Sequence, residues 1–111
     1  MLVAALALLA TSALAQSAAQ VKAYGSAYDA AKKTLAAKPK DAKAKVAYVA
    51  AGDRYATATM MSPDLDRKAK YRDALKVYRE VLKVDPKNHE AKNNSDMIVS
   101  IYKSMGRPVP N

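Results

Sequence analysis

Residues 71–86, YRDALKVYREVLKVDP, decide the fold of this chain. The apolar residues of this segment recur at steps of three and four, which places them on one face of an α-helix. They are Tyr71, Ala74, Leu75, Tyr78, Val81 and Leu82, and charged residues fill most of the opposite face. Asp85-Pro86 predicts the end of the helix, because a proline ring disfavours helical backbone in the residue before it. The segment therefore predicts an amphipathic helix that packs against other helices.

Two further helices are predicted before this segment, and each has its own capping residue. Ser17 begins a capping box with Gln20, so the first helix is expected to start beside Ser17 and to end before Pro39. Asp41 can cap a second helix, which is expected to extend to Met60.

The deciding segment is expected to lie in a third helix, and a fourth helix follows it. The third is predicted to start at Ser62-Pro63-Asp64, with Ser62 as N-cap and Pro63 at the first helical position. Asn88 can cap the fourth helix, and Gly106 can end it, because glycine readily adopts the left-handed backbone of a C-terminal cap. No stretch shows the alternation of a strand. The sequence thus predicts an all-α fold of about four helices in antiparallel pairs.

The chain repeats itself at an offset of 47 residues, which is the step from Tyr24 to Tyr71. The other matching pairs are Ala27 with Ala74, Leu35 with Leu82, Pro39-Lys40 with Pro86-Lys87, Ala44-Lys45 with Ala91-Lys92, and Tyr55 with Tyr102. Repeats of this length built from paired helices are typical of an α-solenoid, in which each unit packs on the next.

The deciding segment resembles the second helix and closing turn of a tetratricopeptide repeat (TPR). Ala74 takes the place of the small contact residue, Tyr78 that of the aromatic residue, and Pro86 that of the turn proline. Residues 24–39 resemble the same half-repeat more weakly. The resemblance covers residues 17–106 and implies a TPR-like α-solenoid fragment, although the offset exceeds the family's repeat of about 34 residues. A plain antiparallel four-helix bundle is the structural alternative.

The resemblance also implies a binding groove. In it, the second and fourth helices would line a shallow concave face that receives a peptide or protein segment. The implied partner-binding residues are Lys43, Val46, Ala50, Asp53 and Arg54 on the second helix and Glu90, Asn93, Met97 and Ser100 on the fourth. Tyr48 and Gly52 also allow an alignment of the second helix shifted by three residues, so both registers stay open.

The function that the resemblance implies is that of a non-catalytic protein–protein interaction adaptor or scaffold. Stacked repeats usually need about three units before their core is continuous. This chain holds only about two repeats, so a protein or peptide partner is expected and self-association is a further expectation.

The N-terminal residues, MLVAALALLATSALA, form an apolar run that ends in Ala13-Leu14-Ala15, a pattern that signal peptidase cleaves. Residues 1–15 are therefore predicted to be a signal peptide, residues 16–106 the helical domain and residues 107–111 a disordered tail. The run is short for a membrane span. No Lys or Arg precedes it, which leaves an apolar first helix as the alternative. The expected location is periplasmic or secreted, with no stable membrane anchor after cleavage.

The formal net charge of the chain is +9, from 19 Lys and Arg against 10 Asp and Glu. The basic residues form two clusters: Lys32, Lys33, Lys38, Lys40, Lys43 and Lys45 around the first turn, and Arg67, Lys68, Lys70 and Arg72 at the start of the third helix. Such clusters can pair with phosphates, so a cationic binder of nucleic acid or of an anionic envelope polymer is the alternative function. The tyrosines could stack on bases, but their places on the apolar stripes favour a core role.

Catalysis is not expected, and no catalytic residue, metal site or cofactor is predicted. His89 is the only histidine, and its polar neighbours favour a solvent-facing position. The absence of cysteine excludes disulfides, thiol catalysis and cysteine-bound metal. The three glycines are widely separated, so no glycine-rich phosphate loop is present.

Overall fold

The computed structural model describes residues 17–111, and the predicted signal peptide, residues 1–15, lies outside this range. Four helices follow one another in it: α2 (Ala18–Ala37), α3 (Ala42–Met61), α4 (Arg67–Val84) and α5 (His89–Ser104). No strand occurs among residues 17–111, so the predicted all-α fold is confirmed. Within the same range no helix has both the length and the apolar character needed to cross a membrane.

Three of the four helices begin at the capping residues that the sequence predicts. The side chain of each accepts a hydrogen bond from a backbone N–H that the first helical turn leaves free. The pairs are Ser17 with the N–H of Gln20 at 3.2 Å, Asp41 with that of Ala44 at 3.0 Å, and Asn88 with that of Ala91 at 2.8 Å. At the other end of the chain, Gly106 has the positive φ of 66° expected of a C-terminal cap.

The predicted N-cap of α4 is wrong. The cap is Asp66, whose Oδ2 accepts from the N–H of Ala69 at 3.1 Å. Ser62 instead ends α3 as its C-cap, and its N–H donates to the carbonyl of Thr59. The physical reason is that α3 continues to Met61, so Ser62 is used to end that helix. The chain then turns over residues 63–66 before α4 begins at Arg67.

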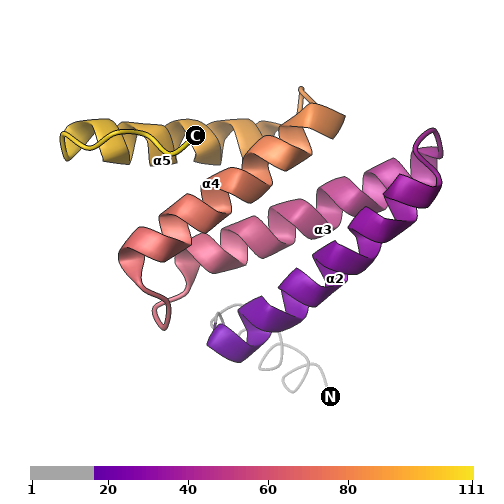
Figure 1. Ribbon diagram of the computed structural model, residues 1–111, viewed down its shortest axis with the longest axis horizontal. Coiled ribbons are helices and arrows are strands. Elements are labelled where there is room, and N and C mark those ends of the chain that lie inside the picture. Colours follow the sequence, from indigo (N-terminus) through magenta and orange to yellow (C-terminus); the bar gives the residue numbers. More distant parts are fainter. Residues whose placement is uncertain (1–16) are drawn as a thin grey trace, which may run out of the picture.

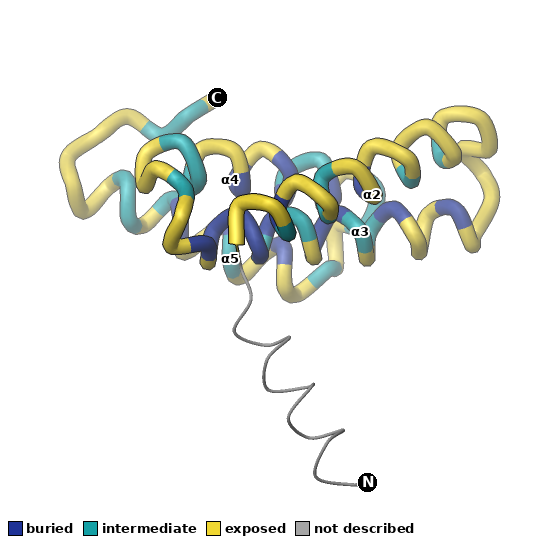
Figure 2. The backbone as a smooth tube through the Cα atoms, turned by 90° about the horizontal axis from the view of Figure 1, so that it is seen from below, coloured by how far each residue is buried: buried dark blue, intermediate teal, exposed yellow. Residues whose placement is uncertain are grey.

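The helices form an open stack. Consecutive helices lie side by side and run roughly antiparallel (Figure 1). α3 contacts α2, α4 and α5, α4 also contacts α5, and α2 and α5 do not meet. Seen at a right angle, α2 and α4 form one layer and α3 and α5 the other (Figure 2). A closed four-helix bundle brings its first and last helices together, and these helices do not close in that way.

The core is built from tyrosine and small side chains. Its buried members are Tyr28, Tyr48, Ala56, Met60, Ala74, Leu75, Val77, Tyr78, Val81, Ala91 and Ile98. Six of the seven tyrosines are buried in this core or packed half-buried against it, so the prediction that they serve the core is confirmed for these six. Tyr24 is half-buried outside it. α3 packs tightly against α4 at Gly52, where an added Cβ would lie 2.4 Å from Cγ2 of Val81.

A polar cluster joins α2, α3 and α4 inside this core. The hydroxyl of Tyr28 lies 2.7 Å from that of Tyr48 and donates to Oε1 of Glu80 at 2.7 Å. Lys32 lies 3.4 Å from the other oxygen of Glu80. Burial, followed by the bonds to Tyr48 and Glu80, raises the pKa of Tyr28 far above its ordinary value, so its hydroxyl stays a donor.

Residues 107–111, the segment predicted to be a disordered tail, contact the helices at two points. Val109 packs half-buried against the core. Nη1 of Arg79 donates to the carbonyl of Pro110 at 2.6 Å. No periodicity or motif in the sequence predicted these contacts.

Candidate functional site

Three of the predicted partner-binding residues line one hollow on the surface of α3, named here the α3 hollow. They are Val46, Ala50 and Asp53. The volume of the α3 hollow is about 570 Å³, within the range of ligand pockets. The rest of its lining is Ala42, Lys45 and Val49 of α3 and Val84, Asp85 and Asn88 at the turn between α4 and α5. Its walls are thus largely apolar, with a few polar groups.

The face of α3 beside the hollow is also apolar and exposed. Lys43, a fourth predicted residue, lines a shallower depression of about 350 Å³ together with Ala42, Val46, Ala47 and Ala50. Val46 has 70% of its surface exposed. A helix that is apolar on nearly all sides is normally buried on all sides. This face of α3 is therefore an apolar helix surface that no other described residue covers.

The predicted residues of α5 divide between the contact with α3 and the solvent. Oε2 of Glu90 accepts from Oγ1 of Thr57 at 2.6 Å, which joins α5 to α3. Met97 is 43% exposed, and Asn93 and Ser100 are exposed. Only Glu90 among these residues is fixed by a hydrogen bond to α3.

Arg54 does not join the α3 hollow. Its guanidinium lies 5.7 Å from the ring centre of Tyr24 on α2, a cation–π distance. Val49, three residues after Val46, lines the hollow. Thr57, three residues after Arg54, donates to Glu90 of α5. The hollow thus contains Val46, Ala50 and Asp53 of the first alignment of α3 as well as Val49, so both registers stay open.

Polar side chains that the sequence did not mark as site residues join α3 to its neighbours. Nδ2 of Asn88 donates to Oδ2 of Asp53 at 2.8 Å. The hydroxyl of Tyr78 lies 2.5 Å from Oγ1 of Thr57 and accepts from Nδ2 of Asn94 at 2.9 Å. Asn88 was predicted only as a cap, and no spacing in the sequence distinguishes Thr57 or Asn94 from surface residues.

Asp53 is held in unfavourable surroundings for a carboxylate. Its surface is only 9% exposed, and its Oδ1 is buried without a hydrogen-bond partner among the described residues. Burial raises the pKa of Asp53; the bond from Asn88 opposes this rise, and the charges of Glu90 and Asp85 add to it. Leaving a buried polar atom unpaired costs about 1–3 kcal/mol. Such unpaired buried atoms are uncommon in folded proteins.

A second hollow of about 360 Å³, named here the α4–α5 hollow, lies between the start of α4 and the end of α5. Its lining is Tyr71, Ile101, Tyr102 and Met105 with the basic residues Arg67, Lys68 and Arg107. The sequence predicted Arg67 and Lys68 as part of a basic cluster. It missed Arg107, which the turn at Gly106 brings to this hollow.

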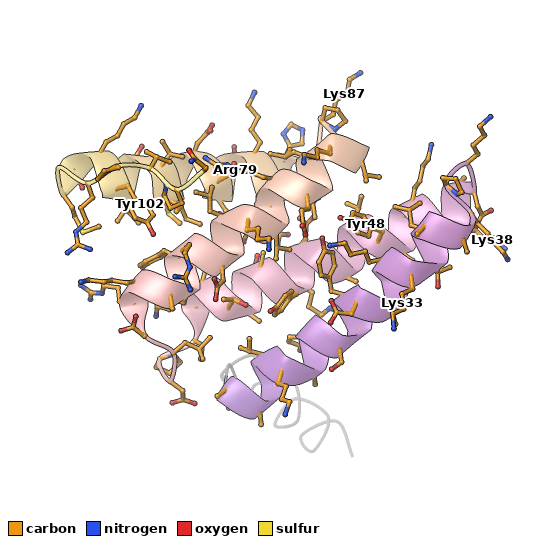
Figure 3. The ribbon with its side chains drawn as sticks, in the orientation of Figure 1. Lys33, Lys38, Tyr48, Arg79, Lys87 and Tyr102 are labelled. Atoms are coloured by element: carbon orange, nitrogen blue, oxygen red, sulfur yellow. The ribbon has the colours of Figure 1, made fainter. Side chains whose placement is uncertain are left out.

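Most of the basic residues form no ion pair in residues 17–111. The two pairs in this range join Lys32 to Glu80 at 3.4 Å and Arg72 to Asp73 at 3.1 Å. The side chains of Lys33, Lys38 and Lys87 point away from the helices (Figure 3). These cations are therefore free to meet an anionic surface.

No group of three or more His, Cys, Asp or Glu in residues 17–111 is placed to hold a metal ion. His89 is exposed at the first turn of α5. Burial raises the pKa of both Tyr28 and Tyr78, so these hydroxyls remain protonated and serve the hydrogen bonds that join the helices.

The two hollows differ in charge as well as in place. The α3 hollow holds carboxylates, and the α4–α5 hollow holds cations. The sequence matches no protein-family model, no curated protein and no solved structure, and the functional conclusion therefore rests on the geometry of these two hollows.

Proposed function

We propose that this protein is a non-catalytic protein–protein interaction adaptor of the TPR type, which binds a peptide or protein segment in the α3 hollow. The main support is that Val46, Ala50 and Asp53, selected from the sequence as groove residues, meet in one hollow. The apolar walls of this hollow and the exposed Val46 offer area that a partner can remove from water.

The arrangement of the helices supports the repeat interpretation. α3 and α5, the helices expected to line a groove, lie in one layer and contact each other, while α2 and α4 lie in the other. Such alternation of layers is what a stack of helix pairs requires. The open end of such a stack also supports self-association, which sedimentation of the protein at rising concentration tests.

We also propose that the adaptor acts outside the cytoplasm, in the periplasm or as a secreted protein. The support is the apolar run of residues 1–15 with its Ala13-Leu14-Ala15 ending. The intact mass of the protein recovered from the native host tests this proposal. A chain that begins at Gln16 supports it, and a chain that keeps residues 1–15 contradicts it.

The binding function is tested by selecting random displayed peptides on the protein and then measuring the selected peptides on variants. Val46→Asp places a charge on the apolar wall at an exposed position, so the fold is preserved while the hollow is altered. Ala30→Asp adds the same charge at an exposed position of α2 and is the matched control. The affinity of the selected peptides is expected to change at least about tenfold on Val46→Asp and to stay the same on Ala30→Asp.

Salt distinguishes this function from a charge-driven one. Binding in an apolar hollow is expected to persist at about 0.5 M salt, where screening reaches only a few ångströms. Peptides that bind both aspartate variants equally and are released at that salt concentration would contradict the adaptor function.

The second candidate function is binding of nucleic acid or of an anionic envelope polymer, and the α4–α5 hollow favours it. Arg67, Lys68 and Arg107 line this hollow beside Tyr71 and Tyr102, and cations beside aromatic rings suit phosphates and bases. The double variant Arg67→Gln, Arg107→Gln is then expected to weaken binding of single-stranded DNA and to reduce its dependence on salt. Unchanged DNA binding by the double variant would rule out this hollow as the site.

A further inference from the structure

We infer that the α3 hollow recognises a lysine or arginine side chain in the bound segment, with the cationic head at Asp53 and the aliphatic stem along the apolar walls. The inference rests on the proposed function of this hollow and adds the chemistry of what it binds.

The unpaired oxygen of Asp53 is the first support. Asp53 is nine-tenths buried, its Oδ2 is occupied by Asn88, and its Oδ1 has no partner among the described residues. A carboxylate oxygen only accepts hydrogen bonds, so the missing partner must be a donor. The terminal torsion of an aspartate is broad. Because Asp53 lines the hollow, rotation about this torsion can turn its carboxylate toward a donor there.

The balance of charge around the α3 hollow is the second support. Asp53 and Asp85 line it, and Lys45 is the one cation in its lining. Glu90 lies close enough to act on the charge of Asp53. This small region therefore has an excess of negative charge in a chain whose net charge is +9. A cationic donor removes the electrostatic cost that the three carboxylates impose on one another.

The shape of the lining is the third support. Val46, Val49, Ala50 and Val84 provide apolar surface next to the carboxylate of Asp53. Lysine and arginine have an aliphatic stem that packs on apolar surface and a charged head that needs a partner. A short polar or a purely apolar side chain satisfies only one of these two surroundings.

The positive field of the rest of the molecule limits the kind of segment that fits. A net charge of +9 repels a strongly basic peptide at long range. Screening confines that repulsion to roughly 8 Å at physiological salt. The expected ligand is therefore a segment with one basic side chain among neutral or acidic neighbours.

The test uses peptides that are selected on the full-length protein and whose affinity changes on Val46→Asp, because the new carboxylate removes apolar contact and also adds negative charge to the hollow that Asp53 lines. Each peptide is resynthesised with norleucine in place of its basic residue, because norleucine keeps the lysine stem and lacks its charge. The affinities of both peptides are measured on the wild type and on Asp53→Asn. Norleucine is expected to reduce affinity at least about tenfold on the wild type and less than about twofold on Asp53→Asn. Asp96→Asn, which removes a charge from an exposed position of α5, is the control and is expected to behave as the wild type.

A carbon-13 titration of the Asp53 carboxyl group in the intact protein gives a second measurement that does not depend on a variant. The lysine peptide is expected to lower the pKa of Asp53, and the norleucine peptide is expected to leave it unchanged. Lys45, Asp85 and Glu90, which surround Asp53, are present in both titrations, so the difference reports the ligand's charge.

The outcomes separate the two proposals. Peptides that require Val46 but contain no basic residue, or that lose equal affinity to norleucine on both proteins, overturn the inference and leave the adaptor function standing. If no selected peptide is sensitive to Val46→Asp, the adaptor function fails, and the inference fails with it.

Discussion

The hydroxyl of Tyr28 lies 2.7 Å from the hydroxyl of Tyr48 and 2.7 Å from a carboxylate oxygen of Glu80. One side chain of α2 is thereby joined to both α3 and α4. Tyr28→Phe is expected to lower the free energy of unfolding by about 1–3 kcal/mol, because it leaves a buried hydroxyl and a partly buried carboxylate without their shared partner. Urea denaturation followed by circular dichroism measures the change.

Tyr24→Phe is the matched control for this prediction. The hydroxyl of Tyr24 accepts only from Gln20 in a partly buried position, so its loss is expected to cost less than about 1 kcal/mol. Equal losses in the two variants would show that the Tyr28 cluster stabilises the fold no more than the bond between Gln20 and Tyr24 does.

The close approach of α3 to α4 predicts that Gly52 cannot be enlarged. Gly52→Ala places a Cβ 2.4 Å from Val81 and 3.0 Å from the ring of Tyr28. Overpacking is expected to destabilise the protein by about 1–3 kcal/mol, although alanine favours helix by roughly 1 kcal/mol. The comparison variant is Gly25→Ala, whose Cβ meets only the Tyr55 side chain at 3.1 Å. A thermal melt that shows Gly25→Ala to be the more damaging change would contradict this account.

Asp53 predicts a dependence of stability on pH. Its pKa is raised in the folded protein, chiefly by burial. Its contribution to stability is therefore fully present below the unfolded pKa of about 3.9 and is lost as the pH rises through the folded pKa. Asp53→Asn cannot ionise, so the variant is expected to gain stability relative to the wild type as the pH rises above about 4.

Urea denaturation of both proteins at several pH values measures this difference. Asp96→Asn removes a negative charge from an exposed position and corrects for the change in net charge. A difference in the free energy of unfolding between Asp53→Asn and the wild type that stays constant with pH would mean that folding does not raise the pKa of Asp53.

The observed cap of α4 gives a fourth prediction. Asp66→Ala is expected to cost about 1 kcal/mol, because the N–H of Ala69 loses its acceptor. The same change at Asp96, in the interior of α5, is expected to be neutral or slightly stabilising, because alanine is the better helix former. Thermal unfolding compares the two variants. An equal change in stability at both positions would contradict the role of Asp66 as the N-cap of α4.

The sequence predicts best those helices whose apolar residues lie on one face, because that face must be buried. The apolar stripe of α4 occupies one face only, and Ala74, Leu75, Tyr78 and Val81 are all buried. α3 is apolar on nearly every side, so its period does not identify the face that meets α5. This is why the sequence allows two registers for α3. It is also why the sequence predicts Arg54 in the groove, whereas its guanidinium lies beside the ring of Tyr24.

The candidate site depends on residues that are distant in sequence. Asp53 and Asn88 are 35 residues apart, and their hydrogen bond follows from the tertiary packing of α3 against the turn before α5. The cap role of Asn88 is visible in the sequence because its acceptor lies three residues away. The orphaned oxygen of Asp53 and the return of Arg107 to the α4–α5 hollow have no local signal of either kind.

Asn88 uses both ends of one planar amide: Oδ1 accepts from the N–H of Ala91, and Nδ2 donates to Asp53. Because the amide is planar, its two ends move together, so Asn88 links the Asp53 carboxylate rigidly to the first turn of α5. The N-cap of α5 thus depends on the same side chain that positions a carboxylate of the α3 hollow.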